Sequence, residues 1–157
     1  MVVRDGIYYK KFSDVPFTGK TTGKSQETFR NGKKDGLWVG YWKYGRIRTK
    51  GTYKDGKRVG PWVNYDNGKL ESKGTYKNGR KHGPWVGYYP NGQLGSKGTF
   101  KNGKPDGSWV NYHKDGQLQS KGTFKNGKSD GSWVGYKEDG TVIEKFTGTF
   151  KNGVKVK

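Results

Sequence analysis

Short stretches of strand-forming residues, separated by turn residues, run along most of the chain. In residues 107–116, Gly-Ser-Trp-Val-Asn-Tyr is followed by His-Lys and then by Asp-Gly. Trp, Val, Tyr, Thr and Phe favour strands, and Asn-Gly and Asp-Gly supply the positive φ angles that tight hairpin turns require. The pattern therefore predicts an all-β fold, a meander of antiparallel strands with two strands per repeat and no helices.

The pattern repeats about every 24 residues. One landmark is Gly-Thr-aromatic-Lys followed by Asn-Gly or Asp-Gly, and a second is Gly-x-Trp-Val-x-Tyr, which occurs five times. Residues 98–112 and 122–136 differ at only two of fifteen positions, which indicates either recent duplication or deliberate consensus design. The tryptophans of the five copies, which we expect to be structural, are Trp38, Trp62, Trp85, Trp109 and Trp133. We expect an elongated single-layer array over residues 26–153, an N-terminal capping hairpin over 1–25 and a basic tail over 154–157.

The strand register can be predicted for one hairpin. If Asp115-Gly116 forms a two-residue turn, Trp109 is paired with Gly122, and an indole over a cross-strand glycine covers exposed backbone. Alternation then places these residues on one face: Trp109, His113, Leu118, Ser120, Gly122 and Phe124. A bulge in the turn would instead shift the pairing by one residue and place Val110 and Tyr112 over glycine. We favour the tryptophan register, and the alternative stays open.

Composition changes the picture of the core. The chain has 28 glycines, 28% hydrophobic residues and a net charge of +19, which is typical of disordered proteins. Aromatic residues, however, make up 15% of it, and stacked repeats can cover one another's rings. The aromatics are therefore expected to form a thin core that needs few aliphatic residues. Cysteine is absent, which excludes disulfides and thiolate chemistry.

The sequence shows no signal peptide and no apolar run of the roughly 20 residues that span a bilayer. A cytoplasmic location is the default expectation. A periplasmic or secreted location stays open if the chain is a trimmed mature form.

The repeat resembles a known family. The run aromatic-Lys-Asn-Gly-Lys-x-x-Gly-x-Trp-Val-x-Tyr-x-x-Asn-Gly-x-Leu is similar to the bacterial variant of the MORN repeat (membrane occupation and recognition nexus), found in proteins often labelled YwqK-type antitoxins. The resemblance covers residues 26–153. It implies a twisted sheet of hairpins and functions in scaffolding, lipid contact or toxin neutralisation. Three departures stand out: Glu27 replaces the first Gly, Tyr44 replaces a turn Asn, and residues 140–148 carry two extra positions.

One segment matches a catalytic motif, but its context excludes the catalytic interpretation. Residues 122–129 match Gly-x4-Gly-Lys-Ser, the phosphate-binding loop of nucleotide hydrolases, but that loop must join a strand to a helix. The same segment recurs at 51–58 and 98–105 without the final Ser or Thr, so we interpret it as a repeated hairpin. The two histidines, His82 and His113, are too few for a metal cluster, and His113 is expected on the sheet surface. No catalytic residue, cofactor or metal is expected.

The aspartates offer no catalytic pair. We interpret them as turn residues or local turn formers: Asp35, Asp55, Asp106, Asp115, Asp130 and Asp139.

Basic residues recur at fixed repeat positions. A first row contains Lys54, Lys77, Lys101, Lys125 and Lys151; a second contains Lys50, Lys73, Lys97, Lys121 and Lys145; a third contains Lys33, Lys57, Arg80, Lys104 and Lys128. Stacked hairpins would repeat such a row at steps of roughly 10 Å, comparable with the Debye length. A polyanion would meet a continuous cationic stripe, although we favour the simpler interpretation that the rows serve solubility and protect the sheet edges.

Two functions follow from different classes. The first is a non-catalytic scaffold that binds a protein partner, either a toxin or a scaffold client. The second is an electrostatic binder of anionic lipid or nucleic acid through the lysine rows. Edge-to-edge self-association is a further open outcome.

Overall fold

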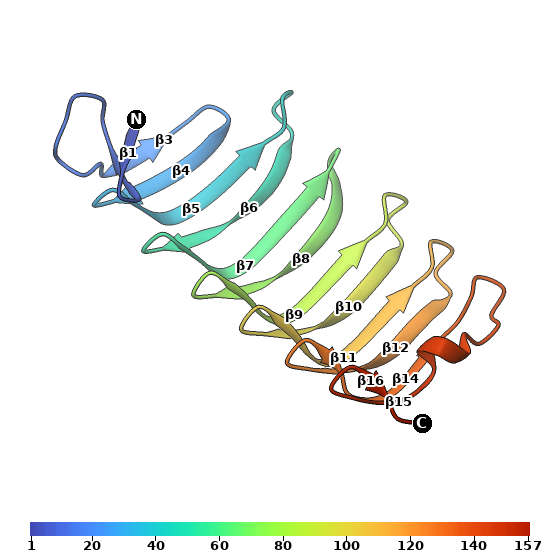
Figure 1. Ribbon diagram of the computed structural model, residues 1–157. Helices are drawn as coiled ribbons and strands as arrows, with labels where there is room; N and C mark the ends of the chain where they lie inside the picture. The colour runs from blue at the N-terminus through green and yellow to red at the C-terminus, as the bar shows by residue number, and fades with distance from the viewer.

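A computed structural model describes residues 1–157. It consists of a two-stranded hairpin followed by one 14-stranded antiparallel sheet in which neighbouring strands follow the chain order, as Figure 1 shows. The predicted all-β meander is confirmed, and the chain has no α-helix; a single 3-10 turn, η1 (Glu144–Phe146), interrupts the strands. The strands are β1 (Val2–Arg4), β2 (Ile7–Tyr9), β3 (Gly19–Thr21), β4 (Ser25–Arg30), β5 (Lys33–Tyr41), β6 (Ile47–Lys54), β7 (Lys57–Asp66), β8 (Lys69–Lys77), β9 (Arg80–Tyr88), β10 (Leu94–Lys101), β11 (Lys104–Tyr112), β12 (Leu118–Lys125), β13 (Lys128–Ser129), β14 (Gly131–Gly135), β15 (Gly148–Lys151) and β16 (Val154–Lys155).

The turns form two rows along the two long edges of the sheet (Figure 1). Along one edge the turn residues share φ angles between 47° and 52°, each followed by a glycine with positive φ, which fits two-residue hairpin turns. These turn residues are Asn31, Asp55, Asn78, Asn102, Asn126 and Asn152. Each turn glycine from Gly56 onward also donates its N–H to a backbone carbonyl of the preceding repeat, as Gly103 does to Lys81 at 2.8 Å. Backbone hydrogen bonds therefore join the repeats at this edge as well as within the sheet.

The opposite edge differs from the expected turn geometry. The turn at Asp115-Gly116 has a three-residue loop, which His113 N–H closes by donating to the carbonyl of Gln117 at 2.8 Å, so the prediction of a two-residue turn is wrong there. Only the Asn67-Gly68 turn keeps the two-residue form, with Asp66 paired to Lys69. That repeat is one residue shorter than its neighbours, which is why its loop is tighter.

The register of the tryptophans is nevertheless the favoured one. Trp109 is paired with Gly122 because a bulge between Leu118 and Ser120 shifts the pairing back by the residue that the longer loop had added. The same bulge pairs Leu118 with Tyr112. Leu118 therefore does not lie across from His113 on the tryptophan face, as the two-residue turn had predicted.

Each indole leans toward the preceding repeat. The ring of Trp109 lies over Gly98 of β10, and Gly122 lies under Trp133; the other tryptophan–glycine contacts are Trp62 on Gly51 and Trp85 on Gly74. A tryptophan thus covers the paired glycine of the strand before it, and not the paired glycine of the strand that follows it. Every such glycine lies between two tryptophans, as Gly98 does between Trp85 and Trp109.

The first position of this row holds Glu27 in place of glycine. Its carboxylate accepts hydrogen bonds from Trp38 Nε1 at 3.0 Å and from Ser25 Oγ at 2.7 Å, and it pairs with Lys34 at 3.1 Å. Burial alone would raise the pKa of Glu27, but these hydrogen bonds and the charge of Lys34 outweigh burial and lower the pKa. The carboxylate therefore satisfies the first indole N–H of the array.

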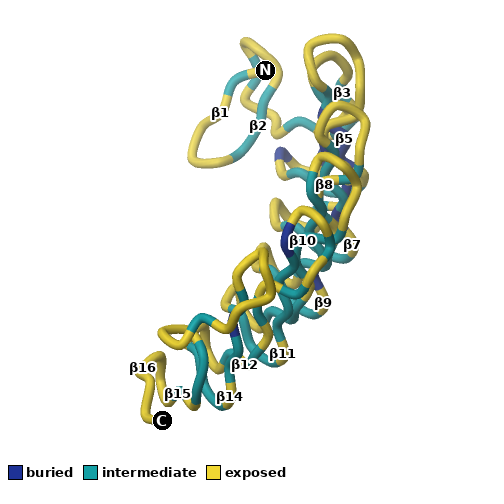
Figure 2. The backbone as a smooth tube through the Cα atoms, turned by 90° about the vertical axis from the view of Figure 1, so that its right-hand side faces the viewer, coloured by how far each residue is buried: buried dark blue, intermediate teal, exposed yellow.

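The two ends of the array are finished differently (Figure 2). The β1–β2 hairpin folds over β4, where the ring centroids of Tyr8 and Phe17 lie 4.8 and 5.6 Å from that of Phe29, which is only 1% exposed. β3 already belongs to the long sheet. At the other end β16, within the stretch expected to be a basic tail, pairs with β15 as the last strand. The domain limits at residues 25 and 153 stay a prediction.

Candidate functional site

Nine aromatic rings form a continuous row across one face of the sheet, which we call the aromatic face. Tryptophans alternate with tyrosines or phenylalanines, with centroid distances of 4.8 to 6.2 Å and interplanar angles of 72° to 90°. Such edge-to-face pairs contribute about 0.5–1.5 kcal/mol beyond the area they bury. The members are Trp38, Tyr53, Trp62, Tyr76, Trp85, Phe100, Trp109, Phe124 and Trp133.

Three basic side chains cover the N-terminal half of this face. Lys34 lies over Trp38, the guanidinium of Arg58 lies 4.5 Å from the ring centroid of Trp62, and Lys81 Nζ lies 4.0 Å from that of Trp85. The three tryptophans are 8%, 1% and 6% exposed, respectively. Cation–π contacts and the aliphatic stems of these side chains thus close the sheet surface where no second layer packs.

The environment of these cations changes their acidity. Burial lowers the pKa of Lys81, because its ammonium faces rings and no carboxylate. Burial would also lower the pKa of Arg58, but hydrogen bonds to the hydroxyls of Tyr53 and Tyr76 outweigh it and raise the pKa. Both side chains therefore act as packed parts of the face rather than as free surface charges.

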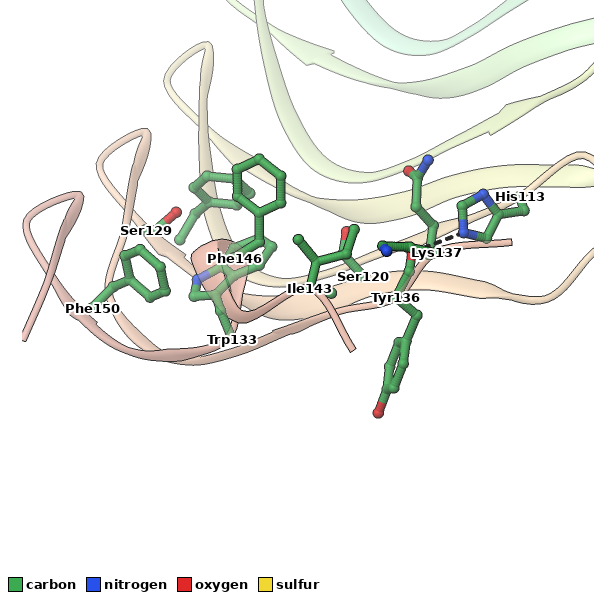
Figure 3. Close-up of a pocket in the computed structure, with 12 residues that line it drawn as sticks. His113, Ser120, Ser129, Trp133, Tyr136, Lys137, Ile143, Phe146 and Phe150 are labelled. Atoms are coloured by element: carbon green, nitrogen blue, oxygen red, sulfur yellow. Dashed lines mark hydrogen bonds between the residues drawn. The ribbon is translucent and has the colours of Figure 1, made fainter. Parts of the chain in front are cut away.

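The C-terminal half of the aromatic face lacks this cover. Pro105 and Ser129 occupy the repeat position of Lys34, Arg58 and Lys81, and Trp109 and Trp133 are only partly buried. A cavity of about 470 Å³ opens here, which we call the C-terminal pocket (Figure 3). Its apolar lining consists of Phe124, Trp133, Tyr136, Ile143, Phe146 and Phe150.

His113 closes the inner end of the C-terminal pocket. Its Nε2 lies 3.0 Å from the carbonyl oxygen of Tyr136 in the next repeat, and the residue is only 8% exposed. The expectation of a surface histidine is wrong, because the imidazole lies against the neighbouring hairpin. The other polar lining residues of the pocket are Gln119, Ser120, Ser129 and Lys137.

The opposite face of the sheet is basic. Lys50, Lys73, Lys97 and Lys121 lie across the strands from valines, as Lys73 does between Val63 and Val86, and we call this surface the basic face. Alternation along each strand sets it opposite the tryptophans. Lys145 departs from this row because it lies in η1.

Basic residues also flank the two-residue turns at Asp55-Gly56, Asn78-Gly79, Asn102-Gly103 and Asn126-Gly127. Cross-strand pairs of like charge occur there: Lys54 with Lys57, Lys77 with Arg80, Lys101 with Lys104, and Lys125 with Lys128. Three ion pairs occur in the whole protein, Arg4–Asp14, Lys34–Glu27 and Lys151–Asp130. Nearly all of the 32 basic side chains are therefore free of carboxylate partners.

Three aspartates have a role that the sequence reading missed. Asp106 Oδ2 accepts a hydrogen bond from the backbone N–H of Asn126 at 3.0 Å, and Asp35 and Asp130 accept from Asp55 and Asn152, both at 3.3 Å. They were expected to shape their own turns, yet each binds the turn of the following repeat. Their fixed position before the Gly of Gly-x-Trp, about 20 residues ahead of the turn they bind, was the signal available in the sequence.

Fold and site together define a β-hairpin repeat protein with an open aromatic face and a basic face, and without a catalytic constellation. The model of the MORN repeat variant matches residues 58–78, 81–102 and 105–126, and that of the MORN repeat matches residues 97–108. The part of the chain between residues 58 and 126 is therefore similar to MORN repeats, which are generally associated with protein or membrane binding. No curated protein matches the chain. None of its helical segments has the length and apolar character needed to cross a membrane.

Proposed function

We propose that the protein is a non-catalytic repeat scaffold that binds a protein partner on the C-terminal half of its aromatic face. The observation that carries this proposal is the loss of the covering cations at Pro105 and Ser129, which leaves the rings of the last repeats partly exposed around a pocket of about 470 Å³. Exposed aromatic surface next to a pocket is the usual anchor of a protein interface. The family resemblance makes a toxin one candidate partner, in which case this protein would be its antitoxin.

The test is a comparison of complexes at two salt concentrations. Immobilised protein captures partners from cells of its source, and each captured protein is then purified and recombined with the scaffold for native mass spectrometry. We expect a stoichiometric complex whose affinity changes by less than about tenfold between 50 and 200 mM salt, because apolar burial is not screened. Capture of nucleic acid or lipid alone, with no protein complex that can be rebuilt, would refute the proposal.

The basic face supports a second candidate function, the binding of anionic lipid or nucleic acid. Its lysines have no carboxylate partners and repeat along the sheet, so their fields add for a polyanion. Replacing Lys73, Lys97 and Lys121 by glutamine would then reduce the slope of log K against log salt by roughly three for duplex DNA. Absence of binding to both duplex DNA and anionic liposomes at about 50 mM salt would exclude this function.

A further inference from the structure

A comparison of the repeats shows which side chain normally covers the rings of the aromatic face. In three successive repeats one residue covers both a tryptophan and the following aromatic ring; Lys81 Nζ, for example, lies 4.0 Å from the centroid of Trp85 and 5.0 Å from that of Phe100. At Ser129 the corresponding side chain is a hydroxymethyl group, and the space beside Trp133 belongs to the C-terminal pocket. The pocket therefore lies at a repeat position that lacks the basic side chain found over the rings in the earlier repeats.

We propose that the C-terminal pocket receives an aromatic side chain from an acidic segment of a protein partner. This inference rests on the proposed scaffold function and specifies the chemistry of the partner. It concerns one position of the array, whereas the scaffold proposal concerns the whole open half of the face.

The lining favours an aromatic anchor. The row of edge-to-face rings ends at the contact between Phe124 and Trp133, whose centroids are 4.8 Å apart. Phe146 and Phe150 also line the pocket, near Trp133 (Figure 3), and Phe146 is 55% exposed. A ring inserted into the pocket would lie among the aromatic side chains of Trp133, Phe146 and Phe150. The volume of about 470 Å³ lies within the range of roughly 300–1,000 Å³ that suits a small ligand, enough for one large side chain and the backbone that carries it.

Charge favours an acidic segment around that anchor. The chain carries a net charge of +19, and its ion pairs involve three basic residues. Lys137, which lines the pocket, is exposed and has no ion-pair partner. Carboxylates flanking the anchor would be drawn to this field and pair with Lys137. Such steering raises the association rate more than the affinity, so the complex keeps the mild salt dependence expected of the scaffold. A partner that inserted arginine or lysine would instead bring positive charge toward an excess of positive charge.

The test uses three fluorescein-labelled synthetic peptides of eleven residues, with alternating Glu and Ser around a central Phe, Ala or Arg. Binding to the full chain is measured by fluorescence anisotropy at about 0.15 M salt. We expect the Phe peptide to bind about tenfold more tightly than the Ala peptide, or better still, because a buried Phe ring gives at least that gain. The Arg peptide should bind no better than the Ala peptide.

Two protein variants test the location of binding. Ser129→Arg restores the covering side chain and should abolish the preference for Phe. Ser132→Arg adds the same charge on the other face, where Ser132 is exposed and pairs with Thr149, and should keep the preference. If Ser129→Arg fails to fold by circular dichroism, Phe146→Ser replaces it, because this exposed side chain lines the pocket without belonging to the sheet.

Equal affinity of the Phe and Ala peptides, a preference for Arg, or an equal effect of Ser129→Arg and Ser132→Arg would overturn the inference. These results would leave the scaffold proposal standing if a partner complex can still be rebuilt. Failure to obtain any such complex would refute the scaffold proposal independently of the peptides.

Discussion

The contact between Trp109 and Gly98 gives the most direct test of how the sheet is held together. Gly98 lies in the middle of β10 with Trp85 and Trp109 as its cross-strand neighbours, and a methyl group there would overlap the six-membered ring of Trp109. Gly98→Ala therefore forces the indole to move. The ring then loses its contacts with Phe100 and Phe124, whose centroids lie 5.3 and 5.8 Å away.

The magnitude follows from opposing effects. Overpacking typically costs about 1–3 kcal/mol, and the displaced edge-to-face contacts are worth about 0.5–1.5 kcal/mol each. Alanine is favoured over glycine in a strand by about 0.5–1 kcal/mol. We expect Gly98→Ala to lower the free energy of unfolding by about 3 kcal/mol.

Gly87→Ala is the matched control. It lies on β9 with only Ser96 Oγ near its Cβ position, at 3.1 Å, and a hydroxyl can rotate away, so its effect should stay within about 0.5 kcal/mol. Urea unfolding followed by circular dichroism measures both variants. In a Trp109→Ala background the cost of Gly98→Ala should disappear, because no ring remains to be displaced. A Gly98→Ala protein as stable as the wild type, or an unchanged cost without Trp109, would refute this account of the ladder.

Three further predictions concern other contacts of the array. The pKa of Glu27 is lowered in the folded protein, so the contribution of its carboxylate to stability is complete above the ordinary value of 4.5 and is lost as the pH falls through the folded-state value. Glu27→Gln should therefore flatten the acid side of the curve of unfolding free energy against pH. Parallel curves for the wild type and Glu27→Gln would contradict this. Asp106→Ala removes the acceptor of the Asn126 N–H and should lower the free energy of unfolding by about 1–2 kcal/mol, whereas Asp115→Asn, which keeps a side-chain acceptor in an exposed turn, should change it little in the same urea titration. Ser129→Arg should raise the thermal midpoint by adding a cation–π contact of about 0.5–1 kcal/mol, and a midpoint no higher than that of Ser132→Arg would show that the side chain does not reach Trp133.

The sequence was sufficient for the fold because the turn residues and the tryptophans act locally. Asn-Gly pairs favour a tight hairpin turn wherever they occur. The pairing of Trp109 with Gly122 could be inferred from one turn and the alternation of side chains along the strands. The predicted turn has the wrong length but the predicted pairing is right, because an extra loop residue and a bulge residue offset each other. Such compensation depends on the whole hairpin and leaves no mark at a single position.

The site was harder to predict because it arises from a difference between repeats. The cations at positions 34, 58 and 81 lie outside the three basic rows that the sequence singled out, and their contacts with the rings depend on how the hairpins stack. The aspartate bonds between repeats were missed for the same reason, as was the burial of His113, which accompanies its link to Tyr136. Ser129 and Pro105 stand out only once the other repeats show what normally occupies their place.

The lean of the indoles gives the array a direction. Each of Trp62, Trp85, Trp109 and Trp133 rests on a glycine that precedes it in the chain. During synthesis on a ribosome, the docking site of every tryptophan has therefore already been made when that tryptophan emerges. A new hairpin can dock at once on finished sheet without waiting for the sequence that follows. Growth of the folded part can keep pace with translation from the N-terminal cap onward, and an added repeat would extend the protein without disturbing what is already in place.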